Sequence, residues 1–288
     1  MITFKDFKND VKPNWCPGCG DFSVQACIQR AAANVGLKPE NLAMVSGIGC
    51  SGRISGYIYS YGFHGIHGRS LPIAQGLKMA NKDLTVIASG GDGDGFAIGM
   101  GHTIHAIRRN IDITYIVMDN QVYGLTKGQT SPRSQSGFVT KSTPAGSIEP
   151  PVSPLELAIS AGATFVAQGF SSDIKELTSL IEAGINHKGF AFINVFSPCV
   201  TYNKVNTYDW FRSNLKKLDE IENYDPTDRV MAMNTVMKYD GLITGLIYQE
   251  QSRPSYQELL KGYDQEPLVK ADLKLDHDKL NQLMNEFI

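Results

Sequence analysis

The chain has 288 residues, 42% of them hydrophobic, and its 27 basic and 29 acidic residues give a net charge of −2. This length and apolar content support a sizeable core, and the near-neutral balance gives no indication of a nucleic-acid or anionic-membrane partner. The sequence shows neither an apolar signal segment at its start nor a run of about 18 apolar residues, and its five unevenly spaced cysteines favour reduced thiols in the cytoplasm over disulfides.

Short apolar runs alternate with helical stretches over the first two-thirds of the chain. The expected strands lie at 42–46, 84–89, 113–118, 164–167 and 190–196. The expected helices lie at 20–36, 70–82, 96–110, 153–161 and 172–187. The second, third and fifth strands are almost entirely apolar or β-branched, which is typical of strands buried on both faces of a parallel sheet. The pattern predicts an α/β fold with a doubly wound, mostly parallel sheet.

Two segments depart from this alternation. Residues 126–154 are rich in Ser, Thr, Gly and Pro, and we expect a long loop that is functional or mobile. Residues 201–288 are more charged and show no strong strand signal. We therefore expect one domain over residues 1–200 and a peripheral C-terminal extension over 201–288.

Four polar or glycine-rich segments directly follow expected strands. They are Gly47–Cys50, Gly90–Gly95, Asp119–Asn120 and Ser197–Cys199. Ligands of open α/β sheets bind beyond the carboxyl ends of the strands. We therefore expect all four segments to meet at one edge of the sheet.

Four of the five cysteines occupy positions that suit a metal cluster. Cys16 and Cys19 form a Cys-Pro-Gly-Cys knuckle, Cys50 follows a glycine-rich turn, and Cys199 follows the last strand. A cubane iron–sulfur cluster takes four thiolates. A thioredoxin-like redox pair is an alternative, although the knuckle does not follow a strand. Structural zinc is another, although zinc ribbons usually have two such knuckles.

The segment Gly47-Ile-Gly-Cys-Ser-Gly52 also fits the Gly-x-Gly-x-x-Gly pattern of dinucleotide sites. Such a site requires an acidic residue about 20 positions later. Between residues 22 and 82 the chain has no Asp or Glu except Glu40. We therefore reject the dinucleotide interpretation.

The segment Gly91-Asp-Gly-Asp-Gly95 and Asn120, which lies 28 residues after Asp92, suit a divalent cation holding a diphosphate. Mg²⁺ prefers oxygen ligands and few protein carboxylates. The Asp92 carboxylate, the Asn120 amide oxygen and the Val122 backbone oxygen can supply three oxygens and one charge. Glycines allow backbone amides to approach phosphate, and the following helix directs its positive N-terminus there. The alternative is a βα turn whose acidic residues cap the next helix.

These motifs together resemble the thiamine diphosphate enzymes, and residues 16–200 resemble the β subunit of 2-oxoacid:ferredoxin oxidoreductases. The matching stretches, in the family's order, are Trp15–Gly20, Gly47–Gly52, His64-Gly-Ile-His-Gly-Arg69, Gly91–Gly95, Asp119-Asn-Gln-Val-Tyr-Gly-Leu-Thr126 and Ser197–Cys199. They extend over about two-thirds of the chain and imply a sheet of the thiamine diphosphate-binding type.

The resemblance implies a set of site residues. The [4Fe–4S] ligands are Cys16, Cys19, Cys50 and Cys199, and the Mg²⁺ ligands are Asp92, Asn120 and Val122. The implied contacts of thiamine diphosphate are Gly49, Cys50, His67, Gly68, Arg69, Gly91, Asp92, Gly93, Asp94, Asn120, Val122, Tyr123, Gly124, Leu125 and Thr126. Among these, His67 and Arg69 are candidates for diphosphate or substrate contacts. Arg53 is a candidate for binding a carboxylate of the 2-oxoacid, because a guanidinium can hold a carboxylate through two hydrogen bonds.

The resemblance also implies an activity: a 2-oxoacid is oxidatively decarboxylated to acyl-CoA and CO₂, with coenzyme A as co-substrate. Electrons pass through the cluster to ferredoxin or flavodoxin. No side-chain nucleophile is expected, and 2-oxoglutarate or broad use including pyruvate is favoured because Arg53 can meet a distal carboxylate. In this family a Glu of the partner α chain, or of a fused γ–α chain, completes the site, so the chain alone is expected to be inactive. The alternatives are a non-redox thiamine diphosphate decarboxylase or synthase, and a scaffold subunit with structural zinc.

Overall fold

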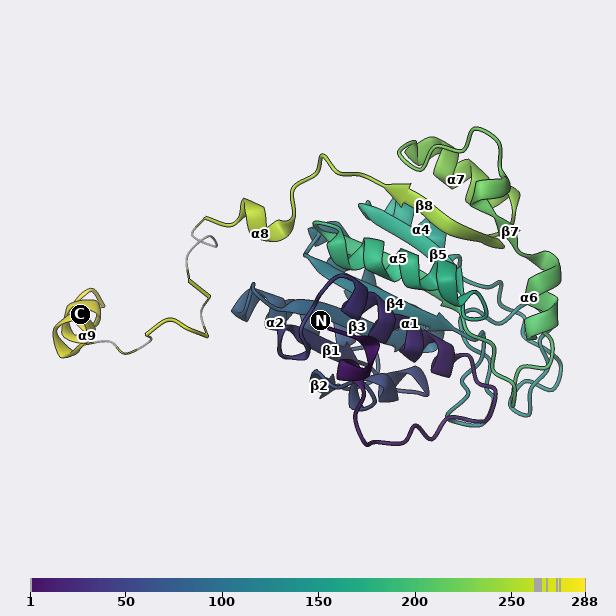
Figure 1. The fold of residues 1–288 in the computed structure, drawn as a ribbon, viewed down its shortest axis with the longest axis horizontal. Helices are drawn as coiled ribbons and strands as arrows, with labels where there is room; N and C mark the ends of the chain where they lie inside the picture. Colours follow the sequence, from purple (N-terminus) through teal and green to yellow (C-terminus); the bar gives the residue numbers. More distant parts are fainter. Residues whose placement is uncertain (1, 262–265, 268, 273, 275, 288) are drawn as a thin grey trace.

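The computed structural model describes residues 2–261, 266–267, 269–272, 274 and 276–287. Its strands are β1 Leu42–Ser46, β2 Tyr61–His64, β3 Thr85–Gly91, β4 Ile113–Asp119, β5 Phe165–Phe170, β6 Phe190–Phe196, β7 Lys216–Lys217 and β8 Ile243–Gln249. They form one sheet in the order β2-β1-β3-β4-β6-β5-β8-β7. Strands β1 to β6 pair in parallel, whereas β8 runs antiparallel to β5 (Figure 1).

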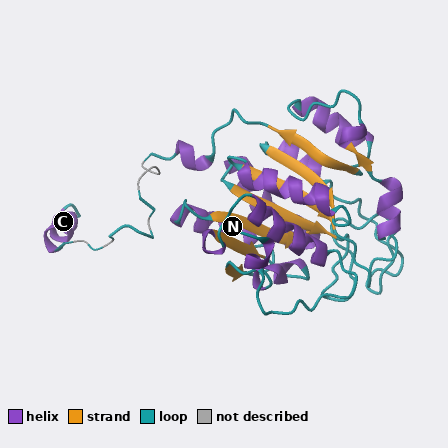
Figure 2. Ribbon diagram, in the orientation of Figure 1, coloured by secondary structure: helices purple, strands orange, loops and turns teal. Residues whose placement is uncertain are grey.

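Helices cover both faces of the sheet, as Figure 2 shows. They are α1 Asp21–Asn34, α2 Ser70–Ala80, α3 Met100–Arg109, α4 Pro154–Ser160, α5 Ile174–Asn186, α6 Tyr208–Asn214, α7 Arg229–Lys238, α8 Tyr256–Leu259 and α9 His277–Asn285. Apolar side chains of α1 and α5 pack on one face of the sheet, and those of α2, α3, α4 and α7 pack on the other. The expected doubly wound α/β fold is confirmed.

The central strands form because their side chains are apolar on both faces. Every residue of β1, β4, β5 and β6 is buried. The expected strands and helices are all present, and their ends differ from the expected ones by at most three residues, except at the start of α3, which lies four residues later than expected. The expected helix at 96–110 is divided, because a π-helical turn at Asp94–Ile98 precedes α3. Such turns often occur at functional sites.

Three strands, β2, β7 and β8, were not predicted from the sequence. Edge strand β2 was not predicted, because all four of its residues are exposed. The expectation that residues 201–288 carry no strong strand is corrected by β8, which pairs with β5. Gly245, whose φ is +125°, and a bulge opposite Val166 and Ala167 interrupt its strand pattern. The division at residue 200 stays a prediction.

The chain ends in α9, which Asp276 caps through a hydrogen bond from the Lys279 backbone N–H at 2.7 Å. This helix lies apart from the sheet (Figure 1). Residues 262–265, 268, 273, 275 and 288 of the expected extension lie outside the described residues. Among the helices that the structure describes, none combines the length and apolar character needed to cross a membrane.

Candidate functional site

A cavity of about 210 Å³ lies at the carboxyl ends of β1, β3 and β4. The lining comes from the segments after these strands and from the loop after β2: Ile48, Gly49, Cys50, Ser51, His67, Gly91, Asp92, Gly93, Asp94, Asn120, Val122, Tyr123, Gly124, Leu125 and Thr126. Three of the four segments expected at one edge of the sheet therefore meet in this cavity, and Cys199 of the fourth lies near it, since a Cβ atom on the lining residue Gly124 would lie 3.6 Å from its Sγ. Of the expected cofactor contacts, Gly68 and Arg69 lie outside this lining, as does Arg53.

Asp92 is a buried acid of the cavity. It is 2% exposed, and its Oδ2 accepts a hydrogen bond from the Ser131 hydroxyl. Burial, and next the charge of Asp119, raises the pKa of Asp92 to about 8. An isolated buried carboxylate is unfavourable in its charged form, and a bound divalent cation offsets that cost. Asp92 is therefore a fitting ligand for Mg²⁺.

Asn120 extends the same ligand set from the end of β4. Its side-chain oxygen accepts a hydrogen bond from the Val122 backbone N–H at 3.1 Å, which fixes the turn between the two residues. Between them, Gln121 is buried and has a φ of +58°, a left-handed conformation that few non-glycine residues adopt. Such strain often occurs at functional sites. The oxygens of Asp92, Asn120 and Val122 suit a hard cation.

The turn after β3 brings the backbone close to the cavity. A Cβ atom on Gly93 would lie 2.1 Å from Cε1 of Tyr123, so only glycine fits beneath this ring. The Tyr123 hydroxyl also donates to the Gly93 carbonyl at 3.4 Å. The helical turn that begins at Asp94 presents its amino end to the cavity. Backbone amides at such a terminus favour a phosphate.

Asp94 lines the cavity but also connects two loops. Its Oδ1 accepts hydrogen bonds from the backbone N–H groups of Ile48 at 2.9 Å and Gly68 at 2.8 Å, and lies 2.9 Å from Nδ1 of His67. Asp94 therefore positions the loops that carry Cys50 and His67. Arg69 points to backbone instead of the cavity, with Nη1 at 3.4 Å from the Ile98 carbonyl. Its expected contact with the cofactor stays a prediction, as do those of Gly68 and His67.

The four expected cluster cysteines are free thiols, and of these Cys50 lines the cavity. A Cβ atom on Gly124 would lie 3.6 Å from Sγ of Cys50, 3.6 Å from Sγ of Cys199 and 4.0 Å from Nδ2 of Asn120. The backbone of Gly124 therefore separates the cysteines from the expected metal ligands by the width of one residue. The fifth cysteine, Cys27, is fully buried within α1, as expected of an apolar packing residue.

The cysteine pKa values reflect both burial and crowding. Burial raises the pKa of Cys50 to about 12, helped by the charges of Asp21, Cys199 and Cys16 and opposed by that of Arg53. Burial, followed by the charge of Asp21, also raises the pKa of Cys19, and Cys50 and Cys199 add to the shift. The thiols of Cys19 and Cys50 thus stay protonated without metal, and a bound metal must displace their protons. These mutual effects place the four sulfurs in one neighbourhood.

Hydrogen bonds connect the chain segments that carry the cysteines. The Trp15 indole N–H donates to the Cys50 carbonyl at 2.7 Å, which joins the knuckle to the segment after β1. The Ser197 hydroxyl donates to the buried Asp21 carboxylate at 2.7 Å, which joins the start of α1 to the segment after β6. The Tyr208 hydroxyl donates to the Gly18 carbonyl at 3.1 Å, so the start of the C-terminal region contacts the knuckle.

Among the described residues, no three or more His, Cys, Asp or Glu side chains are arranged to hold a single metal ion. A tetrahedral zinc site would require four such ligands around one point. In a cubane cluster each thiolate binds a different iron, so the sulfurs lie further apart. A [4Fe–4S] cluster at these four cysteines stays a prediction.

Several residues of the site escaped the sequence analysis. Ile48 and Ser51 line the cavity, and their only sequence signal is their position beside Gly49 and Cys50. Ser131 and Ser134 reach the site from the loop over residues 126–154, where many Ser and Thr residues gave no means of choosing between them. Arg133 in the same loop pairs with Asp119 and is almost buried.

Two family models match the chain. The thiamine pyrophosphate enzyme C-terminal TPP-binding domain matches residues 47–195, which include the entire cavity lining. The C-terminal domain of the pyruvate ferredoxin oxidoreductase beta subunit matches residues 199–265. The first contains the glycine-rich turn and Asn120, and the second begins at Cys199.

Curated relatives and a solved structure resemble nearly the whole chain. Subunit beta of 2-oxoacid:ferredoxin oxidoreductase 2 from Aeropyrum pernix is 39% identical over 285 residues, which cover 94% of this chain and 92% of that protein. The corresponding beta subunit from Sulfolobus sp is 43% identical over 274 residues, or 91% and 88% of the two chains. The structure of 2-oxoglutarate:ferredoxin oxidoreductase from Magnetococcus marinus, with 2-oxoglutarate, coenzyme A and succinyl-CoA bound, superposes with a TM-score of 0.89 at 39% identity, covering 98% of this chain and 96% of that one. The chain therefore belongs to the 2-oxoacid:ferredoxin oxidoreductase family, as a beta subunit with the thiamine pyrophosphate-binding domain.

Proposed function

We propose that this chain is the cofactor-binding subunit of an enzyme that oxidatively decarboxylates a 2-oxoacid to acyl-CoA and CO₂. In this proposal Asp92, Asn120 and the Val122 carbonyl hold Mg²⁺ and the diphosphate of thiamine diphosphate. Cys16, Cys19, Cys50 and Cys199 hold a [4Fe–4S] cluster. The bound thiamine diphosphate supplies the electron sink for decarboxylation, and the cluster carries the released electrons to ferredoxin or flavodoxin.

The observation that carries this proposal is the position of Gly124. Its Cβ position lies 3.6 Å from two cysteine sulfurs and 4.0 Å from the Asn120 amide. A redox cluster and a diphosphate site are thus separated by one residue. That proximity suits electron transfer between the two groups, and a decarboxylase without redox chemistry would have no use for it.

The size of the cavity supports an active site completed by another subunit. Its volume of about 210 Å³ is below the roughly 300–1,000 Å³ typical of small-molecule sites. The cavity therefore suits the diphosphate end, and the rest of the cofactor extends beyond this chain. Leu125, which lines the cavity, is 45% exposed, and Ile66 and Ile98, which lie close in sequence to the lining residues His67 and Asp94, are 73% and 55% exposed. We propose that the α chain, or a fused γ–α chain, covers them and supplies the missing Glu.

For the substrate we propose 2-oxoglutarate or a broad range of 2-oxoacids, with coenzyme A as co-substrate. The similar Magnetococcus marinus enzyme binds 2-oxoglutarate and coenzyme A. Arg53 lies on the turn after Cys50, outside the cavity lining. A role for Arg53 in binding the distal carboxylate therefore requires substrate to approach from the side of Cys50. We propose a cytoplasmic location, where ferredoxin and reduced thiols occur together.

The test is anaerobic purification of the complex of both chains, followed by iron and sulfide analysis and by turnover with 2-oxoglutarate, pyruvate and branched or aromatic 2-oxoacids. We expect four irons and four sulfides in each copy of this subunit, a reducible cluster by electron paramagnetic resonance, and acyl-CoA formation that depends on thiamine diphosphate and an electron acceptor. This chain without its partner should show no decarboxylation. Iron-free, colourless protein would refute the proposal.

The same analysis separates the alternatives. A non-redox thiamine diphosphate enzyme would turn over 2-oxoacids without iron or an electron acceptor. A scaffold subunit with structural zinc would contain one zinc ion and bind no thiamine diphosphate.

A further inference from the structure

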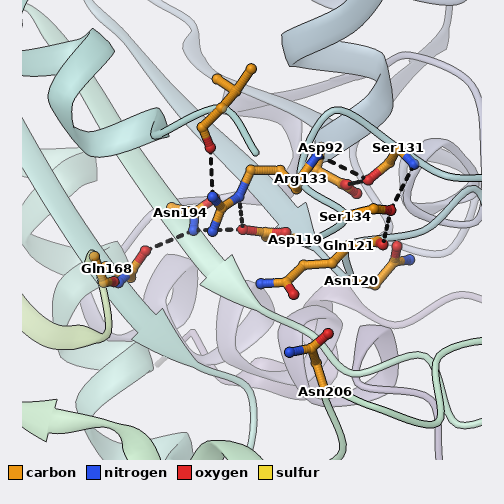
Figure 3. Close-up of polar contacts among 12 residues, drawn as sticks. Asp92, Asp119, Asn120, Gln121, Ser131, Arg133, Ser134, Gln168, Asn194 and Asn206 are labelled. Carbon is orange, nitrogen blue, oxygen red and sulfur yellow. Dashed lines mark hydrogen bonds and ion pairs between the residues drawn. The ribbon is translucent and has the colours of Figure 1, made fainter. Parts of the chain in front are cut away.

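A short segment of the long loop over residues 126–154 touches the expected metal site at three points. Ser131 donates to Oδ2 of Asp92, Ser134 donates to the Gln121 carbonyl at 2.7 Å, and Nε of Arg133 donates to Oδ2 of Asp119 at 2.8 Å (Figure 3). These three residues, Ser131, Arg133 and Ser134, are called the 131–134 clamp below. Its contacts are with Asp92 and with both neighbours of Asn120.

The clamp is buried and its members support one another. Ser131 and Ser134 are 8% and 2% exposed, and the Arg133 side chain is 13% exposed. The Ser131 backbone N–H donates to the Ser134 hydroxyl at 2.9 Å, and the Arg133 backbone N–H donates to the Ser131 hydroxyl at 3.2 Å. Arg133 Nη1 also donates to the Val152 carbonyl at 2.5 Å. The guanidinium therefore fixes the far end of the loop as well.

Each contact fixes a different part of the expected ligand set. The Ser131 hydroxyl occupies one carboxylate oxygen of Asp92 and leaves the other oriented for a cation. Ser134 holds the carbonyl of Gln121, whose left-handed conformation directs the following Val122 backbone. Arg133 neutralises Asp119, a fully buried carboxylate whose charge acts on Asp92.

The same network continues away from the clamp. Nδ2 of Asn194 donates to Oδ2 of Asp119 at 3.2 Å and to Oε1 of Gln168 at 2.8 Å, and Gln168 donates to the carbonyls of Gly241 and Ile243 at 2.6 Å. Figure 3 shows this line of contacts from Asp92 to Gln168. The rigid sheet thus supports Asp119, so that movement of the loop acts on the ligands and not on the strands.

We propose that the 131–134 clamp couples the loop over residues 126–154 to the metal–diphosphate site, so that a closed loop orients Asp92 and Asn120 and bound cofactor holds the loop closed. Ser131, Arg133 and Ser134 are positioning residues, because they act on cofactor through its ligands. The inference rests on the proposed function. The coupling is reciprocal, because a factor by which loop closure tightens binding is the factor by which binding favours closure.

The first test measures affinity for Mg²⁺–thiamine diphosphate by calorimetry on the cofactor-stripped complex of both chains. Residues that orient metal ligands typically contribute about 10–100-fold to affinity. We expect Ser131→Ala and Arg133→Met to weaken binding by about this factor, and Arg133→Lys to restore part of it. Ser136→Ala is the matched control, since this exposed serine of the same loop contacts only the Glu149 carbonyl in the described structure. Its affinity should equal that of the unsubstituted complex.

The second test measures trypsin cleavage after Lys127 and Lys141, two exposed sites in the loop. Saturating cofactor should slow cleavage of the unsubstituted complex and of Ser136→Ala. In Ser131→Ala the ratio of the cleavage rates without and with cofactor should approach 1. A serine with a merely structural role would raise cleavage equally with and without cofactor.

The outcomes separate the two proposals. If the unsubstituted complex binds no thiamine diphosphate, the proposed function is wrong and the clamp with it. If it binds, and Ser131→Ala binds equally well or keeps its protection from trypsin, the clamp alone is wrong. Should Arg133→Met fail to assemble, the smaller change Ser131→Ala decides the matter.

Discussion

The two edges of the sheet carry cavities of opposite character. At the amino ends of the strands lies a cleft of about 760 Å³, lined by Lys78, Asp83, Asp112 and Lys188 among others. Two of its acids are paired with lysines: Asp112 lies 3.1 Å from Nζ of Lys78, and Asp83 lies 2.7 Å from Nζ of Lys270. At the carboxyl ends the cavity has only about 210 Å³, yet it contains the buried Asp92.

The difference shows that volume does not identify the site. The paired charges of the wide surface cleft already have partners, so they do not depend on a ligand. The smaller cavity contains an acid whose pKa burial raises to about 8 and a strained backbone at Gln121. Groups that are costly in the folded chain are candidates for function, because a ligand can offset their cost. Substitutions at the two edges of the sheet test this contrast.

The largest effect should come from Asp92→Asn. This change removes the charge of the expected Mg²⁺ ligand while keeping its shape. Affinity for Mg²⁺–thiamine diphosphate should fall by more than the ~10–100-fold that an outer-shell partner contributes, and turnover of the complex should be lost. Asp112→Asn, at the opposite edge, is the control. Calorimetry and acyl-CoA formation are the measurements, and unchanged affinity in Asp92→Asn would contradict the assignment.

The second prediction separates the proposed cluster site from the proposed metal–diphosphate site, which both lie at the carboxyl edge. In Cys19→Ala we expect loss of iron, of visible absorbance and of electron transfer to ferredoxin, because the cluster lacks one thiolate. Binding of thiamine diphosphate should stay within about 3-fold, since Cys19 lies outside the cavity lining. Cys27→Ala is the control and should keep its iron. Retention of four irons in Cys19→Ala would remove this cysteine from the ligand set.

The third prediction concerns the direction in which the stability of the cofactor-free complex changes with pH. Without cofactor, Asp92 has a folded pKa of about 8, above the value of about 4 in an unfolded chain. Between these values the folded state binds the extra proton, so stability falls as pH rises from about 4 to 8. Asp92→Asn removes this contribution, so at pH 8 the cofactor-free variant should melt above the unsubstituted complex.

Thermal unfolding of cofactor-free complex at pH 5 and pH 8 is the measurement. The gap between Asp92→Asn and the unsubstituted protein should widen at the higher pH, and saturating Mg²⁺–thiamine diphosphate should reverse the order. Asp83 at the other edge provides the contrast: a hydrogen bond from Lys270 lowers its pKa, so it favours stability at higher pH. A gap that does not change with pH would show that Asp92 is ionised without cation.

The site residues on strand ends were predictable, because a strand buried on both faces is visible as an apolar run. Such a run fixes where the strand stops, so the residues after β3 and β4 had to lie together. The β8 strand was not predictable in this way, because Gly245 and a bulge break its pattern.

The contacts of the loop could not be predicted from the sequence either. Ser131 and Ser136 are the same residue type five positions apart, and only the folded path of the loop brings one of them to Asp92. No spacing rule connects a loop serine to a carboxylate 39 residues before it. Motifs therefore predicted the ligands, whereas the residues that orient them required the structure.

The smallest effect should come from the amino edge. Lys188 and Lys261 line the wide cleft. The proposed reaction does not use this cleft. In Lys188→Ala combined with Lys261→Ala, turnover and the KM for 2-oxoacid should stay within about 2-fold, since surface substitutions usually change stability by less than about 0.5 kcal/mol. Steady-state kinetics of the complex decide this. A loss of more than 10-fold would mean that the cleft takes part in the reaction or in assembly, and that buried, costly groups are an insufficient guide to the functional edge of this sheet.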